Sequence, residues 1–283
     1  MSVSPPRRVV VEDGFLVADG GGAEKRPWWS FTKTVLAATA LVLVNKGRLA
    51  LDVPIHGKAY TLRQLLQHRA GLRDYGGLSD YHDAVARCLS PWSVDELLAR
   101  TGADRPLYPP GQGWAYSNIG YLVVRRLIEE TCGDALGTVV RRLVLTPLGL
   151  EAARLARMGD LGDYDPGWVY HGLLVGPLYE AALLLDRLMH GVLLPATAVT
   201  AMLQAHPVGG PVSGRPWLAP GYGLGLMTGI VTGGRTIAGH TGGGPGSVIA
   251  VYHLLSSRPH RTVAAYAEGD DQGVVERSCI REG

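Results

Sequence analysis

A serine and a lysine three residues apart are the first residues of this chain that could do chemistry. Ser30-Phe31-Thr32-Lys33 stands at the start of a long apolar run. If Ser30 opens a helix, positions i and i+3 lie on one face and the two side chains can meet. A serine hydroxyl needs a base to become a good nucleophile, and an amine with a pKa lowered by desolvation can serve. The spacing therefore indicates nucleophilic catalysis, with helix capping as the alternative role for Ser30.

Two further groups of polar residues and glycines follow in the chain. Tyr116-Ser117-Asn118 comes shortly after the stiff Pro109-Pro110-Gly111, and His240-Thr241-Gly242-Gly243 lies between two runs expected to be strands. Taken alone, the first could be a turn and the second a bulge or hairpin.

Taken in order, Ser30-x-x-Lys33, Tyr116-x-Asn118 and His240-Thr241-Gly242 resemble the three motifs of the penicillin-recognising serine enzymes. The Tyr-x-Asn form is similar to class C β-lactamases, D-alanyl-D-alanine peptidases and related esterases, in which the third motif is Lys-Thr-Gly or His-x-Gly. The resemblance covers about residues 28–268. It extends to four other segments, at 65–72 (LLQHRAGL), 108–121 (the family's PGxxxxYSNxGY), 146–150 (TPLGL) and 221–225 (GYGLG).

The resemblance implies a role for each of these positions. Ser30 would attack an acyl carbonyl and become esterified, while Lys33 and Tyr116 would form the proton network, with the identity of the base left open. Tyr116 could be the base only if nearby Lys33 lowered its pKa. Asn118 would bond the acyl-side amide or carbonyl of the substrate. The remaining binding positions would be the oxyanion-hole N–H groups of Ser30 and Gly243, and His240, Thr241 and Gly242 along the third motif.

The chain departs from the family pattern in three places. His240 replaces the lysine of Lys-Thr-Gly, and a histidine is mostly neutral at pH 7, so it is a poorer partner for a substrate carboxylate unless an arginine compensates. This weakens the case for β-lactams and D-Ala-D-Ala peptides. The lead-in before Ser30 is about thirty residues, shorter than is typical. A C-terminal helix, if present, must lie within residues 270–280.

The patterns between the motifs predict an α+β fold. We expect an antiparallel sheet built from both chain ends, flanked by helices, with a mostly helical lobe inserted. The predicted domains are a sheet domain (1–58 and 205–283) and a helical domain (59–204), with the active site in the cleft between them. The expected strands are 8–12 and 15–18 around Asp13-Gly14, then 221–227, 235–238, 247–253 and 261–267. We expect a buried helix over 31–45 and two further helices over 119–131 and 179–190. Capping signatures at 61–64 and 93–96 mark the starts of two more helices, and residues 19–26 are expected to form a loop.

The composition of the chain limits the kinds of binding partner and cofactor that we expect. Against 25 acidic residues there are 27 basic ones, only four of them lysines, and the net charge of +2 gives no reason to expect nucleic acid or an anionic membrane. The three cysteines are widely spaced, which is typical of reduced thiols rather than of a disulfide framework. Neither the cysteines nor the histidines have the spacing of metal ligands, and we expect no metal and no cofactor. His68 and His171 are expected to be structural hydrogen-bond partners. Tyr164, Trp168, Tyr170 and Tyr179 could line an acyl pocket or simply pack.

These observations predict a serine hydrolase of the β-lactamase-like superfamily, acting on a small-molecule ester or amide through acyl-Ser30. Three further activities stay open: an acyltransferase that uses a second acyl acceptor, a β-lactamase or D-Ala-D-Ala peptidase, and a sensor that is acylated without turnover. The longest apolar stretch is too short to span a membrane and no signal peptide is evident, so a cytoplasmic location is expected. The oligomeric state cannot be read from the sequence.

Overall fold

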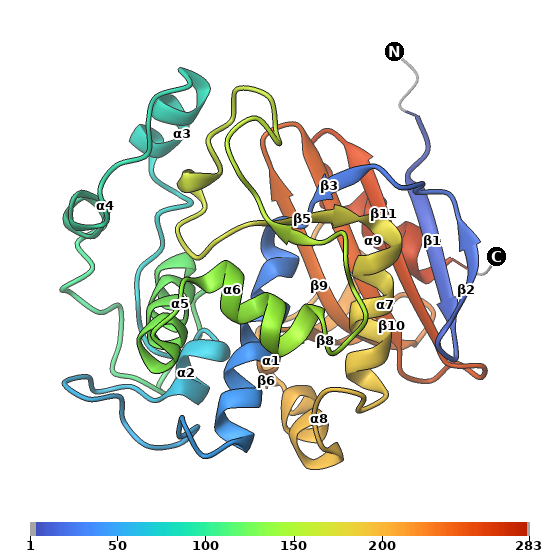
Figure 1. The fold of residues 1–283 in the computed structure, drawn as a ribbon, viewed down its shortest axis with the longest axis horizontal. Helices are drawn as coiled ribbons and strands as arrows, with labels where there is room; N and C mark the ends of the chain where they lie inside the picture. Colours follow the sequence, from blue (N-terminus) through green and yellow to red (C-terminus); the bar gives the residue numbers. More distant parts are fainter. Residues whose placement is uncertain (1–3, 282–283) are drawn as a thin grey trace.

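The computed structural model describes residues 4–281 (Figure 1). The strands are β1 Arg7–Glu12, β2 Phe15–Asp19, β3 Lys25–Pro27, β4 Arg154–Leu155, β5 Leu174–Pro177, β6 His206–Pro207, β7 Trp217–Tyr222, β8 Met227–Val231, β9 Thr236–Gly244, β10 Ser247–Leu254 and β11 Arg261–Glu268. The α-helices are α1 Thr32–Asn45, α2 Leu62–Leu66, α3 Ser79–Ala86, α4 Val94–Thr101, α5 Asn118–Cys132, α6 Leu136–Val140, α7 Leu178–Met189, α8 Ala196–Leu203 and α9 Gln272–Ile280. Short 3₁₀ turns η1 Trp29–Phe31 and η3 Pro166–Trp168 and a π-helical turn η2 Arg141–Leu145 complete the order. Within residues 4–281, none of the helices is both long and apolar enough to cross a bilayer.

Both ends of the chain build one eight-stranded sheet, in the order β2-β1-β11-β10-β9-β8-β7-β6. Every neighbouring pair is antiparallel, and β1 lies between its hairpin partner β2 and β11, with Val10 opposite Val263. The α+β fold with an antiparallel sheet from both ends, flanked by helices, is therefore confirmed. A small second sheet, β3-β5-β4, joins the segment before Ser30 to the middle of the chain.

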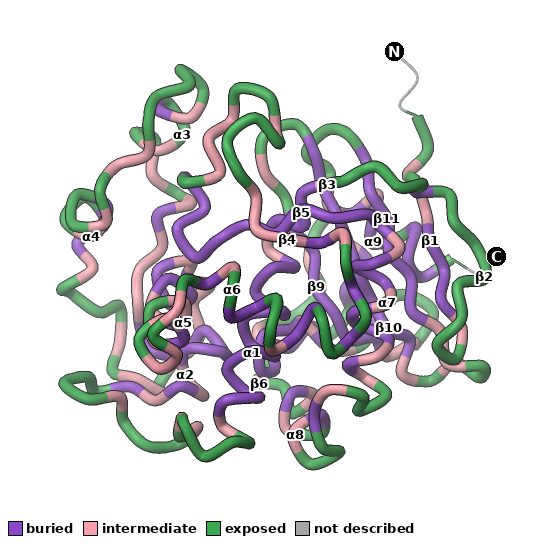
Figure 2. The backbone as a smooth tube through the Cα atoms, in the orientation of Figure 1, coloured by how far each residue is buried: buried purple, intermediate pink, exposed green. Residues whose placement is uncertain are grey.

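Helices cover both faces of the large sheet because successive strand residues point to opposite sides. Val9 and Val11 of β1 belong to the main core with α1 and α7, whereas Val10 belongs to a second core with Val275 and Cys279 of α9. The central strands are accordingly buried along most of their length (Figure 2). A C-terminal helix is present, and α9 lies within residues 270–280, the range to which the sequence confined it.

Helix α1 is buried on nearly all sides, as its apolar sequence predicts. It begins at Thr32 rather than Phe31, because η1 occupies the preceding turn. The hydroxyl of Thr34 donates to the carbonyl of Gly225 at 2.7 Å, which ties the helix to the turn between β7 and β8. The helix that carries Lys33 is thus fixed inside the core.

Most of the other predicted helices are present in the structure. The Thr61–Gln64 capping box is complete, while Ser93 caps α4 but Glu96 turns to Arg100 instead. The predicted helices 119–131 and 179–190 correspond to α5 and α7. Helix α7 lies within 59–204 but packs on the sheet, against β1, β10 and β11. The two-domain division stays a prediction.

Three sequence predictions are wrong in detail. Residues 221–227 are not one strand, since they span the turn from β7 to β8, where Gly225 has a φ of +78°. A Cβ on Gly225 would lie 2.1 Å from the Cβ of Ala37, so only glycine fits against α1. His240-Thr241-Gly242-Gly243 lies inside β9 rather than between strands, and the end of the expected loop 19–26 pairs with β5 as part of β3.

Candidate active site

Ser30 lies in the 3₁₀ turn η1, directly before α1. The N–H of Trp28 donates to the carbonyl of Leu174 at 2.8 Å, which ties the residues just before this turn to β5. Trp29 has a φ of +38°, an unfavourable conformation for a large side chain, and its indole N–H donates to Ser247 Oγ at 3.0 Å. The turn that presents Ser30 is therefore held against both sheets.

Lys33 lies one turn along, with its Nζ 3.2 Å from Ser30 Oγ. Its side chain is fully buried, and desolvation lowers its pKa to about 7, an effect that the charge of Asp74 opposes. A large fraction of Lys33 is thus neutral near pH 7 and able to accept a proton.

Tyr116 reaches Ser30 from the loop before α5 and donates its hydroxyl to Ser30 Oγ at 2.9 Å. Burial raises the pKa of Tyr116, the opposite of what a general base requires. Nearby Lys33, whose Nζ lies 5.0 Å from the ring centroid, does not lower the pKa of the phenol below its usual value. By these pKa shifts Lys33 is better suited than Tyr116 to accept a proton, and Tyr116 is a hydrogen-bond donor to Ser30 Oγ.

Asn118 is the first residue of α5 and lies beside Ser30 in the same pocket. Its backbone N–H donates to Asp74 Oδ1 at 2.8 Å and its side-chain amide to Asp74 Oδ2 at 3.3 Å. Ser117 caps the helix, and its own N–H donates to His68 Nδ1 at 3.1 Å. His68 thus has the structural role expected of it, while Asp74, which orients Asn118, had no signal in the sequence.

Strand β9 closes the site from the opposite side. Gly242 packs so closely on η1 that an added Cβ would lie 2.5 Å from the backbone nitrogen of Ser30 and 3.1 Å from the carbonyl oxygen of Trp28. Gly243 borders both pockets next to Ser30. The third motif therefore provides the wall against which Ser30 is set.

Gly242→Ala is expected to lower kcat/KM for any substrate by about 100-fold, because β9 must move away from Ser30 and a displacement of about 1 Å can cost that much. Steady-state kinetics together with active-site titration would measure it. Gly210→Ala is the matched control, since Gly210 is exposed and nothing lies within 4 Å of its added Cβ. Equal activity of the two variants would contradict the close packing of β9 on the nucleophile.

His240 is buried and neutral. Its Nδ1 lies 2.6 Å from the carbonyl of Thr241 and its Nε2 lies 2.8 Å from the hydroxyl of Tyr222, so Nδ1–H donates and Nε2 accepts. Desolvation, followed by the charge of Lys33, lowers its pKa to about 3. The hydroxyl of Thr241 donates to Glu276 of α9 at 2.5 Å. Neither side chain supplies a positive charge for a substrate.

A family model described as Beta-lactamase matches residues 8–254. The chain belongs to the Beta-lactamase family. This confirms the resemblance drawn from the three motifs, all of which lie within the matched residues, whereas Glu276 lies beyond them.

The relatives of this chain include several hydrolases. Esterase EstB of Burkholderia gladioli is 31% identical over 43% of this chain and 36% of its own length. D-aminopeptidase of Cereibacter sphaeroides is 31% identical over 38% of this chain and 21% of its own. The match thus spans about a third or less of these relatives. The D-stereospecific amidohydrolase from Streptomyces sp. has the same fold, with a TM-score of 0.81, 23% identity and coverage of 100% of this chain and 95% of that one.

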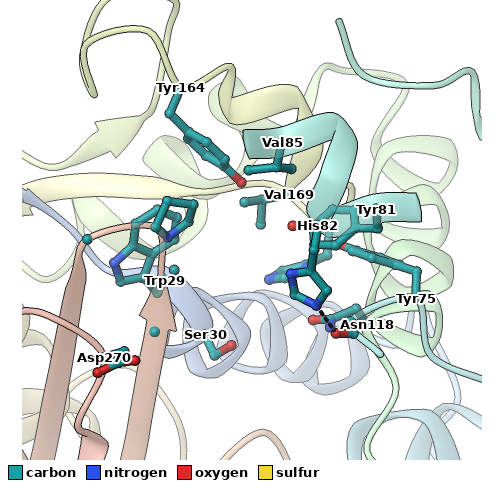
Figure 3. Close-up of a pocket in the computed structure, with 16 residues that line it drawn as sticks. Trp29, Ser30, Tyr75, Tyr81, His82, Val85, Asn118, Tyr164, Val169 and Asp270 are labelled. Atoms are coloured by element: carbon teal, nitrogen blue, oxygen red, sulfur yellow. Dashed lines mark hydrogen bonds between the residues drawn. The ribbon is translucent and has the colours of Figure 1, made fainter. Parts of the chain in front are cut away.

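Two pockets meet at the Ser30 of this Beta-lactamase family member. The first, the aromatic pocket, has a volume of about 510 Å³, and Ser30 lies in it between Trp29 and Asn118 (Figure 3). Its other walls are Tyr75, Gly76, Tyr81, His82, Val85, Tyr164, Val169, His171, Gly243, Gly244, Pro245, Gly246 and Asp270. Of the four aromatic residues proposed from sequence, Tyr164 lines the pocket. Trp168 and Tyr170 pack in the hydrophobic cluster behind its wall, and Tyr179 packs against the main core.

The second, the arginine pocket, has a volume of about 400 Å³ and shares Ser30, Asn118 and Gly243 with the first. Arg215 enters it, yet both its Nε and Nη2 donate to the carboxylate of Glu276, which is fully buried. The sequence gives no motif around either residue. The arginine that could have replaced the missing lysine is therefore already paired with an acid of its own chain.

Proposed function

We propose that this chain is a serine hydrolase that cleaves an ester or amide through an acyl-Ser30 intermediate. The observation that best supports this proposal is that Lys33 is fully buried, has a pKa lowered to about 7, and places its Nζ 3.2 Å from Ser30 Oγ. A neutral amine at hydrogen-bond distance from a serine hydroxyl is the base that this nucleophile needs.

In the proposed acylation step, Ser30 Oγ attacks the substrate carbonyl carbon while its proton moves to Lys33 Nζ. The carbonyl electron pair shifts to the oxygen, which the N–H groups of Ser30 and Gly243 would stabilise. When the tetrahedral intermediate collapses, the leaving group takes a proton from Lys33, directly or through the Tyr116 hydroxyl. Water then attacks the ester carbonyl and gives a proton to Lys33 Nζ. As this second tetrahedral intermediate collapses, the carbon–Oγ bond breaks, Lys33 returns the proton to Ser30 Oγ, and the acid is released with Lys33 neutral again.

The two pockets favour substrates without a carboxylate on the leaving group. In the arginine pocket the charge of Arg215 is offset by Glu276, and His240 is neutral. In the aromatic pocket three tyrosines and Trp29 line the space next to Ser30, and Asp270 is a charged residue in the same lining. Apolar acyl groups, including those that carry an amine, fit this lining. The names of the relatives lead us to propose D-aminoacyl amides beside simple esters.

The test measures turnover of a nitrophenyl ester, of D-phenylalanine amide and of a chromogenic cephalosporin, for wild type and Ser30→Ala. We expect ester and amide turnover in wild type, an acyl adduct mapped to Ser30 by mass spectrometry, slow or no cephalosporin hydrolysis, and none of these in Ser30→Ala. Equal rates in both proteins would mean that Ser30 is not the nucleophile. Fast cephalosporin hydrolysis would favour a β-lactamase.

The same assay separates a hydrolase from an acyltransferase and from a sensor. An acyltransferase would form product faster when an amine or alcohol acceptor is added, because the acceptor then outcompetes water for acyl-Ser30. A sensor would release one equivalent of nitrophenol and stop. A cytoplasmic location also remains a prediction, which cell fractionation would test.

A further inference from the structure

His171 is a second side chain in contact with the base of the proposed reaction. Its Nε2 lies 3.2 Å from Lys33 Nζ, the same distance that separates Nζ from Ser30 Oγ. The imidazole is buried, with 2% of the residue exposed, and it borders the aromatic pocket. Lys33 is thus held between Ser30 and a histidine that belongs to none of the three motifs.

The backbone around His171 is fixed on both sides. Before it, the carbonyl of Tyr170 accepts a hydrogen bond from Arg125 at 3.1 Å. After it, Gly172 has a φ of +95°, and Leu174 N–H donates at 3.0 Å to the hydroxyl of Thr32, the residue next to Lys33. The ring is therefore positioned by the segment that leads into β5, the strand that anchors the turn carrying Ser30.

Chemistry assigns the direction of the contact. Desolvation and the charge of Lys33 hold the pKa of His171 well below its usual value, so its ring is neutral and has one donor and one acceptor nitrogen. An ammonium can only donate, so once Lys33 is protonated the Nε2 atom of His171 must accept and the ring proton lies on Nδ1. The titratable groups that face or act on Lys33 are Tyr116, Tyr121, His68, Asp74, His171 and His240.

We propose that His171 is a positioning residue that accepts an N–H of the Lys33 ammonium formed as Ser30 is acylated, and so aims Nζ at Ser30 Oγ. This rests on the proposed function. The proton moves from Ser30 Oγ to Lys33 Nζ, the Oγ–carbon bond forms, and His171 gains and loses no proton. Its role is to stabilise the charge that develops on Lys33 and to direct the remaining N–H groups.

The test compares His171→Leu, which has no acceptor, with His171→Gln, whose amide oxygen can replace Nε2. For His171→Leu we expect kcat to fall by about 10- to 100-fold and the acidic limb of the kcat/KM profile to move to lower pH by about half a unit to one unit, because the ammonium form loses an acceptor. For His171→Gln we expect the limb near its wild-type position and kcat within about threefold. His56→Leu, an exposed histidine outside the site, is the control.

The outcomes separate this proposal from the function it rests on. Acyl-Ser30 formation in wild type, measured by active-site titration, tests the function alone. If wild type acylates normally but the pH profile of His171→Leu superimposes on it, the His171 proposal is overturned and the function stands. The His171 proposal would also be overturned if both variants lost kcat equally, kept the acidic limb of the wild-type pH profile, and unfolded at lower temperatures. That combination would indicate that His171 acts only through packing.

Discussion

Lys33→Met is expected to lower kcat/KM for a nitrophenyl ester by about 10²- to 10⁴-fold, the usual contribution of a positioned general base. The physical reason is that Lys33 Nζ is the nearest amine to Ser30 Oγ and has a pKa of about 7. Wild-type kcat/KM should rise with pH through about 7 and fall tenfold per unit below it, because only neutral Lys33 accepts the proton. The variant should lose that limb of the profile.

The same variant should remain folded and gain stability at neutral pH. The pKa of Lys33 is lower in the folded chain than in the unfolded one. The penalty for burying its charged form is therefore full below pH 7 and disappears above the ordinary lysine pKa. Methionine removes that cost. Lys46→Met, at an exposed lysine after α1, is the matched control and should change neither activity nor the pH profile. A Lys33→Met enzyme with near wild-type turnover would rule out Lys33 as the base.

Tyr116→Phe distinguishes the two candidate bases. Since burial raises the pKa of Tyr116, we expect this variant to lose a hydrogen-bond donor to Ser30 Oγ but to keep the acidic limb near pH 7. If Tyr116→Phe abolished the limb and Lys33→Met left it in place, the assignment would be reversed.

Glu276→Gln is expected to lower the free energy of unfolding by about 3–5 kcal/mol, because it removes one partner of a buried ion pair. Glu276 is fully buried and accepts hydrogen bonds from Arg215 Nε at 2.8 Å, Trp217 Nε1 at 3.1 Å and Thr241 Oγ1 at 2.5 Å. Urea denaturation followed by tryptophan fluorescence measures the loss. Glu96→Gln, which breaks the exposed pair with Arg100, should cost at most about 1 kcal/mol.

The same change should alter specificity. With Glu276 neutral, Arg215 brings an uncompensated charge into the arginine pocket, so KM for an ester with a carboxylate on its leaving group should fall relative to that for a neutral ester. An unchanged ratio of the two KM values would mean that Arg215 does not face the bound leaving group. A stability loss as small as that of Glu96→Gln would contradict the description of the buried pair.

The contact between Ser30 and Lys33 could be predicted from sequence because the S-x-x-K spacing is local. Three residues separate Ser30 from Lys33, and the helix geometry that joins them is set by an apolar run visible in the sequence. Tyr116 and the third motif were visible in the sequence but were linked to Ser30 only through the resemblance, since 86 residues separate the hydrogen-bonded pair Tyr116 and Ser30. No local sequence pattern predicts the contacts that tertiary packing creates between Asp74 and Asn118, His171 and Lys33, or Glu276 and Arg215.

The segment 221–227 shows where the pattern is misleading. Its alternation of large residues with glycine is typical of a strand, but the positive φ of Gly225 and its closeness to Ala37 turn the chain there. No local rule distinguishes a glycine that packs against a distant helix from one that merely interrupts a strand.

The position of β1 inside the large sheet has a consequence for the order of folding. Arg7 pairs opposite Tyr266, so the strand formed from the start of the chain gains its main partner only after most of the chain has been synthesised. Helix α1 leaves the ribosome early, with Ser30 and Lys33 already one turn apart, but Gly242 of β9 follows some two hundred residues later. A nascent chain stopped before β9 would contain Ser30 and Lys33 without the strand that packs against Ser30, so the proposed activity should appear only when the sheet closes.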